Sequence, residues 1–155
     1  MTHAELASLR GKRLCALDVG MKRIGVAVCD EMHIVVSTRP IIENTPAAIE
    51  ELKQRCATDR IDALIIGVPR LHDDRVTPII EAIQQFIERV RQAVSLPVYE
   101  ADEAFSTKEA RSIMVSSGVK KKKRQTKGVK DQMAAAVILR DVLEEIRSLP
   151  TQERL

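Results

Sequence analysis

An almost wholly apolar run of six residues constrains the fold most strongly. From Ala63 to Val68 the chain reads ALIIGV. Such a run is typical of a parallel strand covered on both faces, whereas a strand with one face in water alternates apolar and polar residues. Helices must then cover both sides of the sheet. The run therefore predicts an α/β fold with this strand near the centre.

Three further strands are expected before this run. The first is Arg13 to Asp18, bounded by the turn-forming Gly20. The second is Ile24 to Cys29, joined to the first by the short stretch VGMKR, which predicts a hairpin. A third apolar run, His33 to Ser37, follows a polar turn. Together they predict an antiparallel meander of three strands.

Helical signals dominate the rest of the chain. Two Thr-Pro pairs supply a cap and a residue suited to the first helical position. Ser106 and Glu109 have the spacing of a capping box. The expected elements are a helix from Thr45 to about Arg60, a helix from Thr77 through Val90, a strand from Pro97 to Glu100, a helix from Ser106 to about Ser117, and a helix from Asp131 to Leu149.

The resulting order is three strands, helix, strand, helix, strand and two helices. It predicts a five-stranded mixed sheet flanked by helices in one domain spanning 1–155. At 155 residues one core can hide roughly 70% of the surface of the unfolded chain. By analogy of fold, the order suggests the ribonuclease-H-like architecture, which sugar kinases and actin-like ATPases share. The fold alone therefore does not settle the function.

Composition favours a reduced, cytoplasmic protein. No apolar run approaches the roughly 20 residues of a membrane span, and the first 13 residues lack the apolar stretch of a signal peptide. The three cysteines, Cys15, Cys29 and Cys56, are odd in number and widely spaced. They support neither a disulfide framework nor a CxxC metal site, so buried thiols are expected.

Acidic residues at strand and helix ends are the candidate catalytic groups. Asp18 ends the first strand, Asp102 and Glu103 follow the fifth, and Asp131 begins the last helix. Ligands of open α/β sheets usually lie at the carboxyl ends of the strands. Clustered carboxylates repel one another unless a cation joins them, and Mg²⁺ or Mn²⁺ prefers such oxygens. Alternatively, Asp18 is a hairpin-turn residue, Glu103 a solvated carboxylate ahead of a helix, and Asp131 the cap of the helix that it begins.

Basic residues crowd one short segment ahead of Asp131. Aromatic residues are only 2% of the chain, so nucleic-acid binding would depend on phosphate charge more than on base stacking. Lys22 and Arg23 lie beside Asp18 and either contact a phosphate or form a solvated turn. His72 is interpreted as a surface-loop residue. The candidate nucleic-acid-binding residues are Lys22, Arg23, Arg70, Arg75, Arg111, Lys120, Lys121, Lys122, Lys123, Arg124, Lys127 and Lys130.

Four stretches of the chain resemble the YqgF/RuvX family, whose members are Holliday-junction resolvase-like proteins associated with maturation of the pre-16S rRNA end. They are LDVGMKRIGVAVCD, IIGVPR, DEAFSTKEAR and DQMAAAVILRDVLE, in that order along the chain. The family aspartate of D-x-G-x-K-R-I-G-V-A corresponds to Asp18, the glutamate of D-E-x-x-S-T to Glu103, and the aspartate of D-x-x-A-A to Asp131. The resemblance implies that these three hold Mg²⁺ or Mn²⁺ and catalyse hydrolysis.

The chain departs from the family pattern at three positions. Ala104 replaces the usual arginine after the glutamate, Asp74 replaces a glycine, and Lys130 replaces a valine. Arg23 or Arg111 is then the expected substitute for the lost cation. An obvious fourth acid is also absent, which leaves open whether one or two metals bind.

Three hypotheses about function follow. The first is a metal-dependent nuclease acting on structured RNA such as pre-16S rRNA, or on branched DNA as a Holliday-junction resolvase. The second is a non-catalytic nucleic-acid-binding module. The third is an ATP-binding relative of the actin and sugar-kinase group, which ranks last because the chain is too short for a two-domain nucleotide clamp. A monomer and a homodimer are both compatible with the sequence.

Overall fold

Five strands form one mixed sheet in a computed structural model that describes residues 1–70, 75–103 and 127–151. The order across the sheet is β3-β2-β1-β4-β5. β1 pairs antiparallel with β2, and β2 with β3, whereas β4 lies parallel to both β1 and β5. The strands are β1 (Leu14–Val19), β2 (Arg23–Cys29), β3 (Val36–Glu43), β4 (Ala63–Val68) and β5 (Val98–Asp102). All six residues of β4 are buried, as its apolar sequence predicted.

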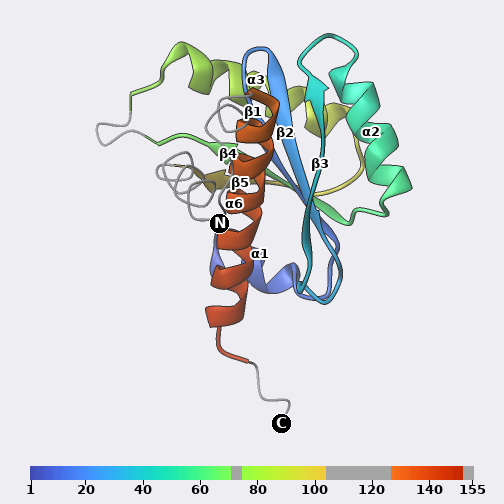
Figure 1. Ribbon diagram of the computed structural model, residues 1–155. Helices are drawn as coiled ribbons and strands as arrows, with labels where there is room; N and C mark the ends of the chain where they lie inside the picture. Colours follow the sequence, from blue (N-terminus) through green and yellow to red (C-terminus); the bar gives the residue numbers. More distant parts are fainter. Residues whose placement is uncertain (71–74, 104–126, 152–155) are drawn as a thin grey trace.

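Helices cover both faces of this sheet (Figure 1). The long helix α6 crosses one face and packs on β1, β2 and β3, with α1 beside it. On the other face α2 packs on β3, and α3 on β4 and β5. The bounds are α1 (His3–Ser8), α2 (Ala48–Thr58), α3 (Pro78–Ala93) and α6 (Lys127–Ser148). The predicted five-stranded mixed sheet flanked by helices is confirmed, while the helix expected from Ser106 to Ser117 lies outside the described residues.

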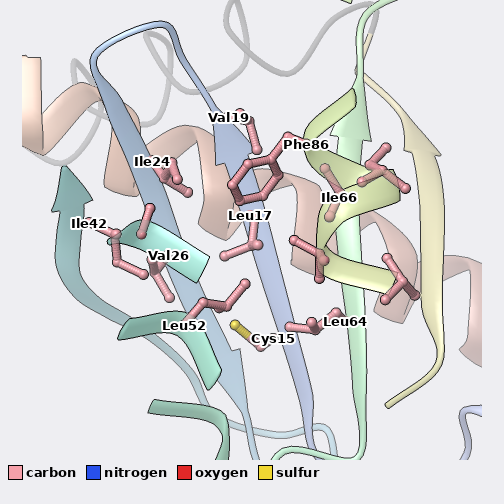
Figure 2. Close-up of a cluster of buried hydrophobic side chains, with 14 of the residues drawn as sticks. Cys15, Leu17, Val19, Ile24, Val26, Ile42, Leu52, Leu64, Ile66 and Phe86 are labelled. Carbon is pink, nitrogen blue, oxygen red and sulfur yellow. The ribbon is translucent and has the colours of Figure 1, made fainter. Parts of the chain in front are cut away.

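Two hydrophobic cores lie on opposite faces of the sheet. Cys15, Leu17 and Val19 of β1 face the core beneath α2 and α3, shown in Figure 2. Leu14 and Ala16 face the core beneath α6. Because successive side chains of a strand point to opposite faces, the next even-numbered residue of β1 also faces α6. That residue is Asp18.

The third strand was predicted in the wrong place. His33, Ile34 and Val35 lie outside the strand, which begins only at Val36. Asp30 explains the difference, because its Oδ1 accepts hydrogen bonds from the backbone N–H groups of Ile34 (3.0 Å) and Val35 (2.9 Å). These bonds, that to Val35 first, lower the pKa of Asp30. The strand then continues through Pro40, which an edge strand tolerates.

Some helix boundaries also differ from the predicted ones. Thr77 caps α3 as predicted, accepting the N–H of Ile80 at 3.3 Å. The expected start at Thr45 is wrong, because α2 begins at Ala48. The short helix α1, with its Thr2 and Glu5 capping box, was not predicted.

The last helix begins earlier than predicted. α6 starts at Lys127, so Asp131 already lies inside the helix and is not its N-terminal cap. This position removes the simplest structural explanation for Asp131. The predicted core residues Ala134, Val137, Ile138 and Val142 are buried, whereas Met133 is only half-buried.

The three cysteines are free and buried, as expected from the sequence. Burial raises the pKa of Cys15 well above its usual value and raises that of Cys56 to about 11. These thiols therefore stay protonated near neutral pH and serve packing. No helix in the described part of the chain is long and apolar enough to cross a membrane.

Candidate active site

Two of the three predicted acids share one face of the sheet. Asp18 is half-buried near the end of β1, where it pairs with Gly25 of β2. Glu103 directly follows β5, and its backbone N–H donates to the carbonyl of Val68 at 3.1 Å. Tyr99 and Ala101 of β5 pack with the α6-side core, so the alternation of the strand places Glu103 on that side too.

Gly67 of β4 lies between these two acids. The last residues paired between β1 and β4 are Leu17 and Ile66, so Asp18 and Gly67 are the next positions of two adjacent strands. A Cβ added at Gly67 would lie 3.1 Å from Oε2 of Glu103 and 2.6 Å from Cδ1 of Ile138. The missing side chain is therefore what lets the Glu103 carboxylate lie over β4, toward β1.

The third proposed acid belongs to the helix that covers this face of the sheet. Asp131 lies within the first two turns of α6, the helix that covers the same face, while its side chain lies outside the described residues. Among the side chains that the structure describes, no group of three or more Asp, Glu, His or Cys residues gathers. Asp18 and Glu103 are thus the described part of the candidate site, and α6 is the element that brings Asp131 to their side of the sheet.

The turn that carries Lys22 and Arg23 is held tightly. Gly20 donates its N–H to the carbonyl of Arg23 at 2.8 Å, and a Cβ at Gly20 would lie only 2.8 Å from that oxygen. Asn44 fixes the turn from the end of β3, since its Nδ2 donates to the Gly20 carbonyl (2.7 Å) and its backbone N–H to the Lys22 carbonyl (2.9 Å). The turn therefore holds two cations at a defined place after Asp18.

The other predicted cations fall in different places. Arg70 forms an ion pair with Asp102, and both side chains are exposed. Arg70 and Arg75 line a cavity of about 140 Å³ together with Ile80 of α3, which lies on the opposite face from Asp18. Lys130 is half-buried on α6. Outside the described residues lie Arg111, Lys120, Lys121, Lys122, Lys123 and Arg124, the Lys127 side chain, and also His72, Asp74 and Ala104.

Sequence reasoning missed three residues that shape the site: Gly67, Asn44 and Gln132. Gly67 stood within an apolar strand, and Asn44 within a polar turn. Gln132 follows Asp131 directly, and its Nε2 donates to the Arg39 carbonyl at 2.7 Å. The contacts of all three reach other elements, so local pattern carried no signal for them.

Comparison with solved structures defines the class of protein. The fold is similar to that of Thermus thermophilus RuvC in complex with a Holliday junction substrate, with a TM-score of 0.54 and 15% identity over 87% of this chain and 96% of that one. It is also similar to a fowlpox virus resolvase bound to Holliday junction DNA, with a TM-score of 0.56 and 14% identity over 86% and 98%. The chain therefore has the ribonuclease-H-like fold of these resolvases.

Sequence comparison then defines the family. The profile of the RuvX family, described as Holliday junction resolvase, matches residues 12–145. A Christiangramia forsetii protein that carries the provisional name pre-16S rRNA nuclease is 35% identical over 86% of this chain and 98% of its own length. A Bacillus cereus protein of the same provisional name is 35% identical over 85% and 98%. The chain belongs to the RuvX family.

Proposed function

We propose that this chain is a divalent-metal-dependent nuclease that hydrolyses phosphodiester bonds during maturation of the 5′ end of pre-16S rRNA. One observation carries the proposal: Asp18 and Glu103, from the ends of β1 and β5, flank the side-chain-free Gly67 on the face that α6 covers. The proposed substrate, pre-16S rRNA, is taken from the provisional name of the relatives.

The described donors fit Mg²⁺ or Mn²⁺. Both are carboxylates, the donor type that hard cations prefer over thiols, and Gly67 leaves room beside them. Asp18, Glu103 and Asp131 are the proposed ligands. When bound, such a metal activates water and stabilises the leaving oxygen of a phosphodiester. Gly67 keeps the space above β4, next to the Glu103 carboxylate, free of a side chain.

Cations near the site are proposed to guide the nucleic acid. Lys22 lies on the turn that follows β1, and Arg23 is the first residue of β2, four and five positions after Asp18. The basic segment from Lys120 to Lys130 immediately precedes Asp131 in the sequence. Both would contact phosphates, which position a substrate without reading its sequence. We further propose that the chain works as a single domain in the cytoplasm, where buried free thiols stay reduced.

A cleavage assay tests the proposal and separates two substrates. The purified chain is incubated with Mn²⁺ or Mg²⁺ and either an RNA carrying the pre-16S 5′ extension or a four-way DNA junction. The junction is included because the family profile and both fold relatives concern Holliday junctions. We expect metal-dependent cleavage of the RNA that a chelator abolishes. Preferred cleavage of the junction would instead identify a resolvase, and cleavage of neither would contradict the nuclease proposal.

Charge reversal in the basic segment is expected to weaken substrate binding and flatten its salt dependence. The variant Lys121→Glu/Lys122→Glu/Lys123→Glu removes three cations. Each cation that binds a phosphate releases counterions from the nucleic acid, so the magnitude of the slope of log affinity against log salt should fall by about 2 to 3. Binding is measured by fluorescence anisotropy at several salt concentrations. Reversal of Lys12 and Lys53, two exposed lysines far from the segment in the sequence, is the control. An unchanged slope would remove the segment from the proposed binding surface.

Asn44→Ala is expected to raise KM more than it lowers kcat. The substitution removes the Nδ2 hydrogen bond to the Gly20 carbonyl, worth roughly 1 kcal/mol, and loosens the turn that carries Lys22 and Arg23. Steady-state cleavage kinetics give the two constants. Thr45→Ala is the control, because within the described part of the chain the Thr45 hydroxyl bonds only in its own turn, accepting the Ala47 N–H. Equal KM values for wild type and Asn44→Ala would show that the turn does not help to bind substrate.

A further inference from the structure

A β-bulge interrupts the edge of the sheet beside the candidate site. Ile24 pairs with Ile42 and Val26 with Arg39, so Gly25 alone on β2 faces two residues, Pro40 and Ile41, on β3. Gly25 is also the partner of Asp18 on β1. The bulge therefore lies at the same level of the sheet as Asp18, two strands away. Bulges are frequent next to active sites, where they redirect side chains or end strand pairing.

Side chains from both helical layers bind carbonyl groups of this bulge and of Arg39, the residue directly before it. From α2, Arg55 donates Nη1 to the Pro40 carbonyl and Nη2 to the Ile41 carbonyl, the latter at 3.3 Å. From α6, Gln132 donates Nε2 to the Arg39 carbonyl at 2.7 Å in a partly buried place. The bulge is thus the point at which the N-terminal part of α6 is tied to the sheet.

We propose that Gln132 is a positioning residue, which sets the place of the proposed metal ligand Asp131 by tying α6 to the bulge. The inference rests on the proposed function, since Asp131 is a ligand only if the site binds metal. Asp131 is the residue directly before Gln132 in the helix, so a shift or rotation of α6 at Gln132 moves both. Arg39 pairs with Val26, which pairs with Leu17, so the bond fixes α6 one residue from the level of the sheet where Asp18 lies.

The other end of α6 offers a matched comparison. There Arg147 donates Nη2 to the His33 carbonyl at 3.3 Å, again from a helix side chain to a backbone oxygen of a distant segment. Residue 147 is 15 positions beyond Gln132, or about 22 Å along a helix of 1.5 Å rise per residue. A bond that merely stabilises α6 could be lost at either end with similar effect. A bond that positions Asp131 matters only at the Gln132 end.

The test compares Gln132→Met with Arg147→Met. Methionine keeps the length of glutamine but cannot donate a hydrogen bond. The affinity for Mn²⁺ is measured by isothermal titration calorimetry, together with Tm and the kcat and KM for cleavage of the RNA substrate. We expect Gln132→Met to weaken Mn²⁺ binding about tenfold, the size seen for residues that orient metal ligands, and to lower kcat with KM within twofold. Arg147→Met should leave Mn²⁺ affinity and kcat within twofold of wild type, whatever its Tm.

Each outcome decides the inference. Equal Mn²⁺ affinity in Gln132→Met and wild type would overturn it, as would an equal loss in Arg147→Met or an absence of Mn²⁺ binding by wild type. If Gln132→Met does not fold, Gln132→Ala, which leaves no long side chain to accommodate, is measured instead. Mn²⁺ binding that depends on Asp18 and Gln132 without cleavage of RNA or junction DNA would reject the proposed nuclease function and still support the role of Gln132.

Discussion

Replacing Asp18 by asparagine is expected to reduce cleavage at least about a hundredfold while leaving the fold intact. Asparagine has the same shape, and Asp18 is half-buried beside Gly25, so little repacking is needed. The amide carries no charge and is a poorer ligand for a hard cation than a carboxylate. The loss of one of three proposed ligands should weaken Mn²⁺ binding and slow the hydrolytic step. Single-turnover cleavage with saturating metal measures the effect.

The neighbouring acid Asp102 supplies a control at the same end of the sheet. Asp102 precedes Glu103 in the chain, is exposed, and pairs with Arg70 rather than with the candidate site. Exposed ion pairs contribute little to stability, so Asp102→Asn should fold normally and keep kcat within about threefold. Cleavage by Asp18→Asn at the rate of wild type would point to a contaminating nuclease. In that case the chain would be better described as a nucleic-acid-binding module without catalysis.

The sequence predicted the central strands well because their patterns are set by burial. β4 was found from its apolar run alone, since only a strand covered on both faces can be apolar throughout. The third strand was misplaced because the side chain of Asp30 accepts the N–H groups of Ile34 and Val35 and holds those apolar residues outside the strand. The hydrophobicity pattern shows only which residues are apolar. The backbone conformation here depends on hydrogen bonds to one carboxylate several residues away, which that pattern does not show.

The shared face of two proposed ligands was predictable from the sequence, whereas the residues that support them were not. Asp18 lies near the end of β1 and Glu103 directly follows β5, and ligands of such sheets usually lie at strand ends, so their proximity could be expected. Gly67 and Gln132 could not be found in this way. The role of Gly67 depends on the Glu103 carboxylate next to it, and the role of Gln132 on a carbonyl 93 positions earlier in the chain. Such contacts exist only after the sheet and α6 have packed.

Gly67→Ala is expected to lower cleavage about ten- to a hundredfold through displacement of Glu103. The new methyl group would lie 3.1 Å from Oε2 of Glu103 and 2.6 Å from Cδ1 of Ile138, so both side chains must move. Displacement of a catalytic group by even an ångström can cost about a hundredfold in rate. Crowding should also destabilise the protein by about 1–3 kcal/mol, which thermal unfolding measures.

The double variant Gly67→Ala/Ile138→Val separates the two contacts. Valine lacks the Cδ1 that the new methyl group would strike, so crowding against α6 is relieved and part of the lost Tm should return. Ile138→Val alone should cost only about 0.5–1.5 kcal/mol and leave cleavage within threefold. Because the contact with Glu103 persists, the double variant should remain as slow as Gly67→Ala. Recovery of cleavage together with Tm would show that Gly67 serves the packing of α6, and that the Glu103 carboxylate need not lie over β4 for activity.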